Sequence, residues 1–301
     1  MSEALTDRID DRLVREVLGL VASRPFSAAQ LGWTDAALPA TLTFLDAERY
    51  LPVLLANPNI AAAFVTPALR GAVEASGRVV VESADPRYDY HALHNHLART
   101  RKRWWPTEIH PTAAVHRTAF VAERNVRIGA GTRIEPNATI LEDVEIGEDC
   151  IVRAGAVLGS EGYEHKRTTR GILSVVHDGI VEVGHRVEIG ANACIDKGFR
   201  GKPTRIGDDT KIDNLVHVAH SVVLGQRCMV VASAMLGGST VFGDDVWVGP
   251  NATVSSVLRV GERASVTLGA VVTRNVEPES RVSGNFAVAH EKFLAFLKTI
   301  R

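Results

Sequence analysis

The chain has 301 residues, with 34 basic and 35 acidic side chains and a formal net charge of −1. Hydrophobic residues make up 46% of the sequence, enough to bury the core of one large domain or two smaller ones. The balanced charge gives no reason to predict nucleic acid as a partner, and no apolar run approaches the roughly 18 residues of a membrane helix.

Residues 1 to about 105 predict a small α/β domain. The first twenty residues carry aliphatic side chains at helical spacing, and their mixture of acids and bases is unlike a secretory leader, which predicts a cytoplasmic protein. The segment "TLTFLDAERYLPVLL" follows, and "AAAFVT" and "RVVVES" predict short apolar strands. "DYHALHNHLARTRKRWWP" predicts a helix and a linker into the next domain.

From residue 106 to about 277 the sequence repeats every six residues. Aliphatic or aromatic side chains recur without a break from 206 onwards, at Ile206, Ile212, Val218, Leu224, Val230, Leu236, Phe242, Val248, Val254, Val260, Val266 and Val272. Earlier runs have the same period, from Ile109 to Leu158 with a slip of one residue after Val121, and from Val183 to Ile195. A period of six fits neither a helix nor plain strand alternation, and instead predicts a coil with three flat faces and one inward residue on each. Stacked coils bury such a ladder of side chains.

Two segments interrupt the repeat, and both are predicted to leave the coil. "SEGYEHKRTTRGILSVVHDG" (160–179) is polar and out of register, and "FRGKP" (199–203) is shorter. Loops on a rigid scaffold often carry functional residues. After the repeat, residues 278–301 predict a turn and a C-terminal helical tail.

The stretch "KIDNLVHVAHSVVLG" (211–225) sets two histidines into the repeat. His220 lies two places after the inward Val218, and Gly238 holds the same place one coil later. Their backbones should therefore be one strand spacing apart, about 4.8 Å. An imidazole can accept a proton from an attacking amine at neutral pH, and a glycine N–H can stabilise an oxyanion, so the pair suits acyl transfer.

Two other interpretations of the histidines remain open at this point. They can be surface residues of the repeat with no chemical role, or metal ligands. His217 and His220 have no third ligand selected by spacing, and the three cysteines form no CxxC pair, so the sequence predicts no metal site.

The hexad pattern resembles the hexapeptide-repeat acyltransferases, which implies a left-handed parallel β-helix and a homotrimer. "IGANACIDKG" (189–198) and the 204–226 segment are similar, more specifically, to the UDP-3-O-(3-hydroxyacyl)glucosamine N-acyltransferases of lipid A biosynthesis. That resemblance implies that His220 is the general base and that Gly238, in "GGS", supplies the oxyanion amide. It also places Asp213, Asn214, His217 and Ser239 at the substrate.

The N-terminal domain shares the resemblance through "TFLDAERY", where Phe44 and Tyr50 would hold a uracil between two rings. An ordinary core role for these two rings is the alternative. The sequence departs from the family at Val257, where a second histidine is expected, and at Ala47, where an asparagine is expected.

We therefore expect an enzyme that moves a (3-hydroxy)acyl group from a thioester to the amine of a UDP-linked amino sugar. Acyl carrier protein or coenzyme A would deliver the thioester as a cosubstrate, and no cofactor is implied. The alternatives are a short-chain acyl-CoA-dependent enzyme acting on another nucleotide amino sugar, and a non-catalytic β-helix scaffold. A metal-dependent hydratase on the same fold would require bound zinc.

Overall fold

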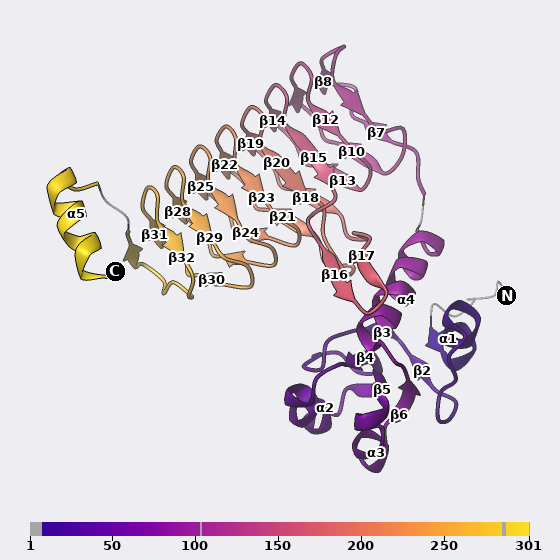
Figure 1. Ribbon diagram of the computed structural model, residues 1–301. Helices are drawn as coiled ribbons and strands as arrows, with labels where there is room; N and C mark the ends of the chain where they lie inside the picture. The colour runs from indigo at the N-terminus through magenta and orange to yellow at the C-terminus, as the bar shows by residue number, and fades with distance from the viewer. Residues whose placement is uncertain (1–7, 103, 285–286, 301) are drawn as a thin grey trace. The chain divides into compact units, whose positions relative to one another are not determined.

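The computed structural model describes residues 8–102, 104–284 and 287–300, and these form two compact units (Figure 1). The N-terminal unit combines the described residues up to 102 with Tyr163–Val176. The second unit runs from Trp104 to Gly162 and continues from His177.

The N-terminal unit is built on a parallel sheet in the order β3-β4-β5-β6, formed by Gln30–Leu31, Thr41–Leu45, Ile60–Val65 and Val79–Glu82. A short antiparallel pair, β1 (Ile9–Asp10) and β2 (Ser27–Ala28), lies beside helix α1 (Asp11–Leu18). The remaining helices are the 3-10 helix η1 (Glu48–Tyr50), α2 (Leu51–Ala56), α3 (Pro67–Ala75) and α4 (Pro86–Thr100).

Two apolar clusters lie on the two faces of this sheet, because successive side chains of a strand point to opposite faces. Phe64 of β5 belongs to one cluster, with Val14 of α1 and Tyr90 of α4. Its neighbour Val65 belongs to the other, with Leu54 of α2. The strands predicted from the apolar runs at 61–66 and 78–83 are thus confirmed as β5 and β6.

The longer interruption of the repeat leaves the coil, as predicted, but forms a β-hairpin rather than an irregular loop. Its strands are β16 (His165–Thr168) and β17 (Gly171–Ser174), paired antiparallel. The hairpin is fastened to α4 because the Asn95 side-chain amide donates to the Ser174 carbonyl at 2.8 Å and accepts from the Val176 amide at 2.8 Å.

The second unit is a parallel β-helix whose coils carry three stacked sheets (Figure 1). Among the described residues, the first sheet contains β7 (Glu108–Ile109), β10 (Val126–Ile128), β13 (Val144–Ile146), β18 (Val181–Val183), β21 (Thr204–Ile206), β24 (Val223–Leu224), β27 (Val241–Phe242) and β30 (Arg259–Val260). The second contains β8 (Ala114–Val115), β11 (Arg133–Ile134), β14 (Ile151–Val152), β19 (Glu188–Ile189), β22 (Lys211–Ile212), β25 (Met229–Val230), β28 (Trp247–Val248), β31 (Ser265–Val266) and β33 (Arg281–Val282). The third contains β9 (Phe120–Val121), β12 (Thr139–Ile140), β15 (Val157–Ser160), β20 (Cys194–Asp196), β23 (His217–Val218), β26 (Met235–Leu236), β29 (Thr253–Val254) and β32 (Val271–Val272).

The register of these sheets confirms the six-residue repeat. Ile212 pairs with Val230, and Val218 pairs with Leu236, so each inward residue stacks on its equivalent in the next coil. The inward residues from 206 to 272 are all buried. Glycine recurs just after them because neighbouring coils approach closely there: a Cβ on Gly207 would lie 2.5 Å from the carbonyl carbon of Gly225.

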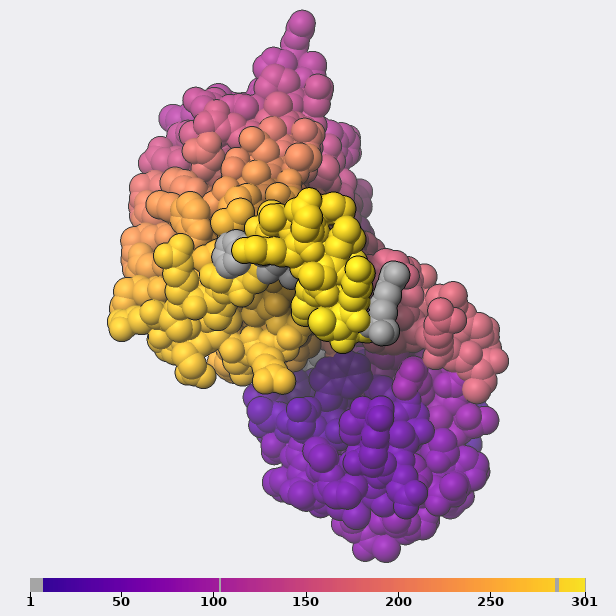
Figure 2. Space-filling view, turned by 60° about the vertical axis from the view of Figure 1, so that its left-hand side comes forward, coloured from indigo at the N-terminus to yellow at the C-terminus, as the bar shows by residue number. Residues whose placement is uncertain are grey.

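The C-terminal tail contains α5 (His290–Thr299), and none of its side chains is buried. They lie on the surface in the space-filling view, where the helix is yellow (Figure 2). Within the described part of the chain, no helix combines the length and the apolar character needed to cross a membrane.

Candidate functional site

His220 lies at the corner that links the third sheet to the first, between β23 and β24. Gly238 occupies the equivalent corner of the next coil, and the Ser239 amide donates to the His220 carbonyl at 2.9 Å. A Cβ placed on Gly238 would lie 2.7 Å from His220 Nε2 and 2.8 Å from Cε1. The imidazole of His220 therefore packs directly over the Gly238 backbone, as the spacing in the sequence predicts.

Within the described part of the chain, the backbone amide of Gly238 lacks the side-chain cap that its equivalents at some other corners have. In several coils the amide two places after the inward residue is capped by an Asp or Asn oxygen from the next coil: His185 by Asp208 at 2.9 Å, Ala191 by Asn214 at 2.7 Å and Gln226 by Asp244 at 2.9 Å. In the next coil the position equivalent to Gly238 is occupied by Ser256, where a cap would need Asp or Asn. Among the described residues, the Gly238 amide has no hydrogen-bond acceptor. A donor without such a cap can meet negative charge on a ligand.

His217 precedes this corner on the outer face of β23. Its Nε2 lies 3.4 Å from Asp196 Oδ2, and the Ser160 hydroxyl donates to Asp196 Oδ1 at 2.7 Å. Burial raises the pKa of the Asp196 carboxyl, although the Ser160 hydrogen bond and the nearby His217 act to lower it. The Asp196 carboxylate thus lies within reach of the His217 ring nitrogen.

Cys194 pairs with His217 in the register of the third sheet, so the two side chains lie on adjacent coils. Ligand atoms of Cys194, Asp196 and His217 all fall within 4.8 Å of one another, and thiolate, carboxylate and imidazole are the ligand types of zinc. The sequence did not predict this grouping. Hydrogen bonds account for it without an ion, because Ser160 contacts both Cys194, at 3.2 Å, and Asp196.

Asp213 and Asn214 lie at a different corner, between the second and third sheets. Besides the Asn214 cap on Ala191, the Asp213 carboxylate accepts from the amides of Asn214 at 2.7 Å and Ala232 at 3.1 Å. The structure does not bring these two residues to His220 within one chain, because a full strand separates the two corners. Their contact with substrate stays a prediction.

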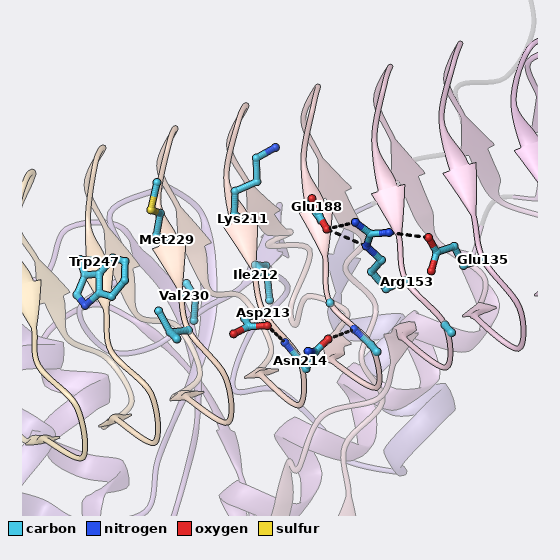
Figure 3. A pocket seen from close by; sticks show the side chains of 14 residues that line it. Glu135, Arg153, Glu188, Lys211, Ile212, Asp213, Asn214, Met229, Val230 and Trp247 are labelled. Carbon is cyan, nitrogen blue, oxygen red and sulfur yellow. Dashed lines mark hydrogen bonds and ion pairs between the residues drawn. The ribbon is translucent and has the colours of Figure 1, made fainter.

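Asp213 and Asn214 border an open pocket of about 450 Å³ on the outer face of the second sheet (Figure 3). Arg153 bridges Glu135 and Glu188 at one end of it, at 2.8 and 2.5 Å, and Met229 and Trp247 lie at the other. Trp247 remains 42% exposed. The sequence analysis did not single out this surface. The feature that could have revealed it is the pair of Met229 and Trp247, which stand just before inward residues of successive coils and are exposed.

Phe44 and Tyr50 line one pocket of about 540 Å³ within the N-terminal unit. Phe44, at the end of β4, packs against Tyr90 with ring centroids 4.8 Å apart, whereas Tyr50 is 41% exposed. Asp46 lines the same pocket and is held by Arg87, whose Nε donates to Asp46 Oδ2 at 2.7 Å. Phe44 and Tyr50, the two rings predicted from the sequence to bind a uracil, therefore line the same pocket. A flat ligand held by both rings would require this.

Two further residues of the sites were missed in the sequence. Trp33 lines the N-terminal pocket, with its ring 5.7 Å from Phe44. His177 is fully buried beside His220 in the second unit, with ring centroids 5.3 Å apart. The sequence analysis could not place His177 beside His220, because a residue in an out-of-register segment cannot be positioned from periodicity.

The comparisons with known proteins agree with the repeat and the fold. The family model "Bacterial transferase hexapeptide (six repeats)" matches residues 125–160 and 203–238. A solved UDP-N-acetylglucosamine acyltransferase from Campylobacter jejuni covers 64% of this chain and 83% of its own, with a TM-score of 0.50 and 21% identity. LpxA from Acinetobacter baumannii covers 62% and 77%, with a TM-score of 0.50 and 20% identity. The predicted class, a left-handed parallel β-helix with a small N-terminal α/β unit and a C-terminal helix, is confirmed.

The comparison of sequences points to a narrower group of enzymes than the comparison of structures. A UDP-3-O-acylglucosamine N-acyltransferase from Wolinella succinogenes is 37% identical over 56% of this chain and 53% of its own length. The enzyme of that name from Bordetella pertussis is 29% identical over 86% and 81%. The chain spans only about half the length of the Wolinella relative. The predicted resemblance is confirmed: this protein is a relative of the UDP-3-O-acylglucosamine N-acyltransferases.

Proposed function

We propose that the protein is an N-acyltransferase that moves an acyl group from a thioester to the amine of a UDP-linked amino sugar. The observation that carries the proposal is the His220 imidazole packed against Gly238, whose backbone amide has no hydrogen-bond acceptor among the described residues. A base beside an oxyanion donor is what attack of an amine on a thioester requires.

In the proposed reaction the amine nitrogen attacks the thioester carbonyl carbon while His220 removes a proton from it. The Gly238 amide donates to the oxygen of the tetrahedral intermediate. Collapse of the intermediate breaks the C–S bond, and the proton held by His220 passes to the departing sulfur. The products are an amide and a free thiol.

The N-terminal pocket is the proposed binding site for the nucleotide. A pyrimidine ring in this pocket would stack on Phe44 and Tyr50, and binding energy gained away from the reacting amine can position that amine. The relatives' name, UDP-3-O-acylglucosamine N-acyltransferase, supports a UDP-linked acceptor.

The homotrimer predicted from the resemblance would place a neighbouring copy beside each chain. Asp213 and Asn214 of one copy could then meet the site of His220, His217 and Ser239 of another, which one chain alone does not allow. We propose acyl carrier protein as the donor's carrier, with coenzyme A as the second candidate, and a cytoplasmic location.

Release of free thiol tests the proposal. Purified protein would be offered 3-hydroxyacyl carrier protein, long-chain acyl-CoA and acetyl-CoA, each with 3-O-acylated and unacylated UDP-glucosamine. We expect turnover with one pair, and a loss of several orders of magnitude in His220→Ala. The matched control is His116→Ala, which removes an exposed corner histidine far along the coil.

Each alternative has its own result in this experiment. Turnover only with acetyl-CoA identifies the short-chain enzyme. UDP-sugar binding without thiol release from any pair indicates the scaffold. Turnover that survives His220→Ala would contradict the mechanism.

A further inference from the structure

The segment that returns the chain to the β-helix ends in a buried histidine that the proposed mechanism does not use. The side chain of His177 is 0% exposed, and its ring centroid lies 5.3 Å from that of His220 at an interplanar angle of 65°. The edge of one imidazole thus faces the other. Histidine is seldom fully buried, and here the buried ring lies directly against the proposed base.

Phe199, from the second excursion of the chain, completes a cluster of three rings. Its centroid lies 5.4 Å from His177 and 5.8 Å from His220. The Phe199 amide is itself held by the Ser221 hydroxyl at 3.0 Å, on the corner that carries His220. Residues from both interruptions of the repeat therefore pack against the same imidazole.

The opposite sides of the His220 ring meet backbone. A Cβ on Gly238 would lie 2.7 Å from His220 Nε2, and a Cβ on Gly162 would lie 3.0 Å from Cδ2 and 2.9 Å from His177 Nε2. Two glycines and two rings enclose the imidazole, so the room for another orientation of its ring is small.

Charged groups surround this cluster from several coils. Glu161 Oε2 lies 3.9 Å from His177 Nδ1, and its other oxygen lies 3.8 Å from Lys197 Nζ. Lys197 also contacts Asp143 at 3.8 Å. Asp196 Oδ2 would lie 3.2 Å from a Cβ on Gly162, close to both histidines. His177 is therefore connected, through Glu161, to the charged side chains of Lys197 and Asp143 on other segments of the chain.

We propose that His177 is a positioning residue for the acyl-transfer base: it holds the His220 ring in the orientation over Gly238 from which Nε2 reaches the attacking amine. The inference rests on the proposed function and deepens it. Because misplacement of a catalytic group by about 1 Å can lower the rate 10²-fold, the effect of removing His177 belongs in kcat rather than KM.

The test compares His177→Ala and His177→Gln with wild type and with His220→Ala. Gln keeps both a donor and an acceptor in the buried site, whereas Ala keeps neither. One readout is thiol release, resolved into kcat and KM. The other needs no substrate: the rate at which diethyl pyrocarbonate modifies His220, followed by mass spectrometry of the His220 peptide.

We expect His177→Ala to lower kcat about 10²-fold with little change in KM. We also expect it to raise the modification rate of His220 severalfold, because the ring gains freedom. His177→Gln should recover about 10-fold of the lost kcat at a melting temperature close to wild type. A His177→Ala variant with unchanged kcat and unchanged modification of His220 would overturn the proposal, as would a loss in both variants that follows their melting temperatures.

The two proposals fail differently in this experiment. Thiol release by wild type that is abolished in His220→Ala, but unaffected in both His177 variants, overturns only the role of His177. Absence of thiol release from wild type overturns the proposed function, and the modification rate then still reports whether His177 restrains the ring.

Discussion

Replacing Gly238 by alanine should disable the site while leaving the fold intact. The new Cβ would lie 2.7 Å from His220 Nε2, whereas ordinary van der Waals contact begins at 3.4 Å, so the ring must move by about 0.7 Å. The obstructing atoms belong to a side chain and not to backbone, so a small shift of the ring within its enclosed site relieves the clash and the coil itself need not move. A displacement of this size should lower kcat/KM about 10²-fold, equivalent to about 2.7 kcal/mol of transition-state stabilisation.

Two other glycines serve as matched controls. A Cβ on Gly237 would lie 2.5 Å from the backbone nitrogen of Ser256, so Gly237→Ala should lower the melting temperature because backbone must shift. A Cβ on Gly71, inside α3, meets nothing within 4 Å, so Gly71→Ala should retain activity and gain up to about 1 kcal/mol of stability.

The assay is thiol release with the pair of substrates that wild type turns over, together with thermal unfolding followed by circular dichroism. Gly238→Ala should lose activity at an unchanged melting temperature. Wild-type kcat/KM in Gly238→Ala would refute the arrangement of His220 over Gly238. So would a fall in melting temperature as large as that of Gly237→Ala, since the loss of activity would then reflect unfolding.

Two further predictions concern stability. Val257 has a φ of 63°, which strains the backbone of a β-branched residue. Val257→Asn should therefore raise the free energy of unfolding, measured by urea denaturation, by about 1 kcal/mol. The control Val271→Asn, which lies on strand β32, should give no such increase. Burial raises the pKa of Asp85, but hydrogen bonds from Thr169 and Tyr88 outweigh it, so the pKa lies below the ordinary value of 3.8. Asp85 therefore stabilises the fold above that value and loses its contribution as the pH falls through its lowered pKa. Asp85→Asn should be less stable than wild type at pH 7 and nearly equal to it in strong acid; an equal deficit at both pH values would contradict this assignment.

The β-helix could be predicted from the sequence because its repeat is local and strict. Once Val218 and Leu236 are placed inward on successive coils, the stacking of Gly238 on His220 follows from counting. The strands at 61–66 and 78–83 were likewise predicted, since short apolar runs bounded by polar residues allow few other structures.

Periodicity alone could not place the residues of the two excursions. His177 and Phe199 reach His220 from segments without register, and the hairpin at 165–174 packs on α4 through the side chain of Asn95. The grouping of Cys194 with His217 also escaped, because the excursion of the chain between them replaces the usual spacing of one coil.

The sequence by itself determined the coil, its inward ladder and the pairing of His220 with Gly238, because each depends on a spacing along the chain. Only the tertiary structure decided what surrounds that pair and which corner amides are capped. It also decided that His177 and Phe199 lie against His220. Those features depend on where the segments outside the repeat pack and on which side chains of neighbouring coils meet. The local pattern of residues specifies neither.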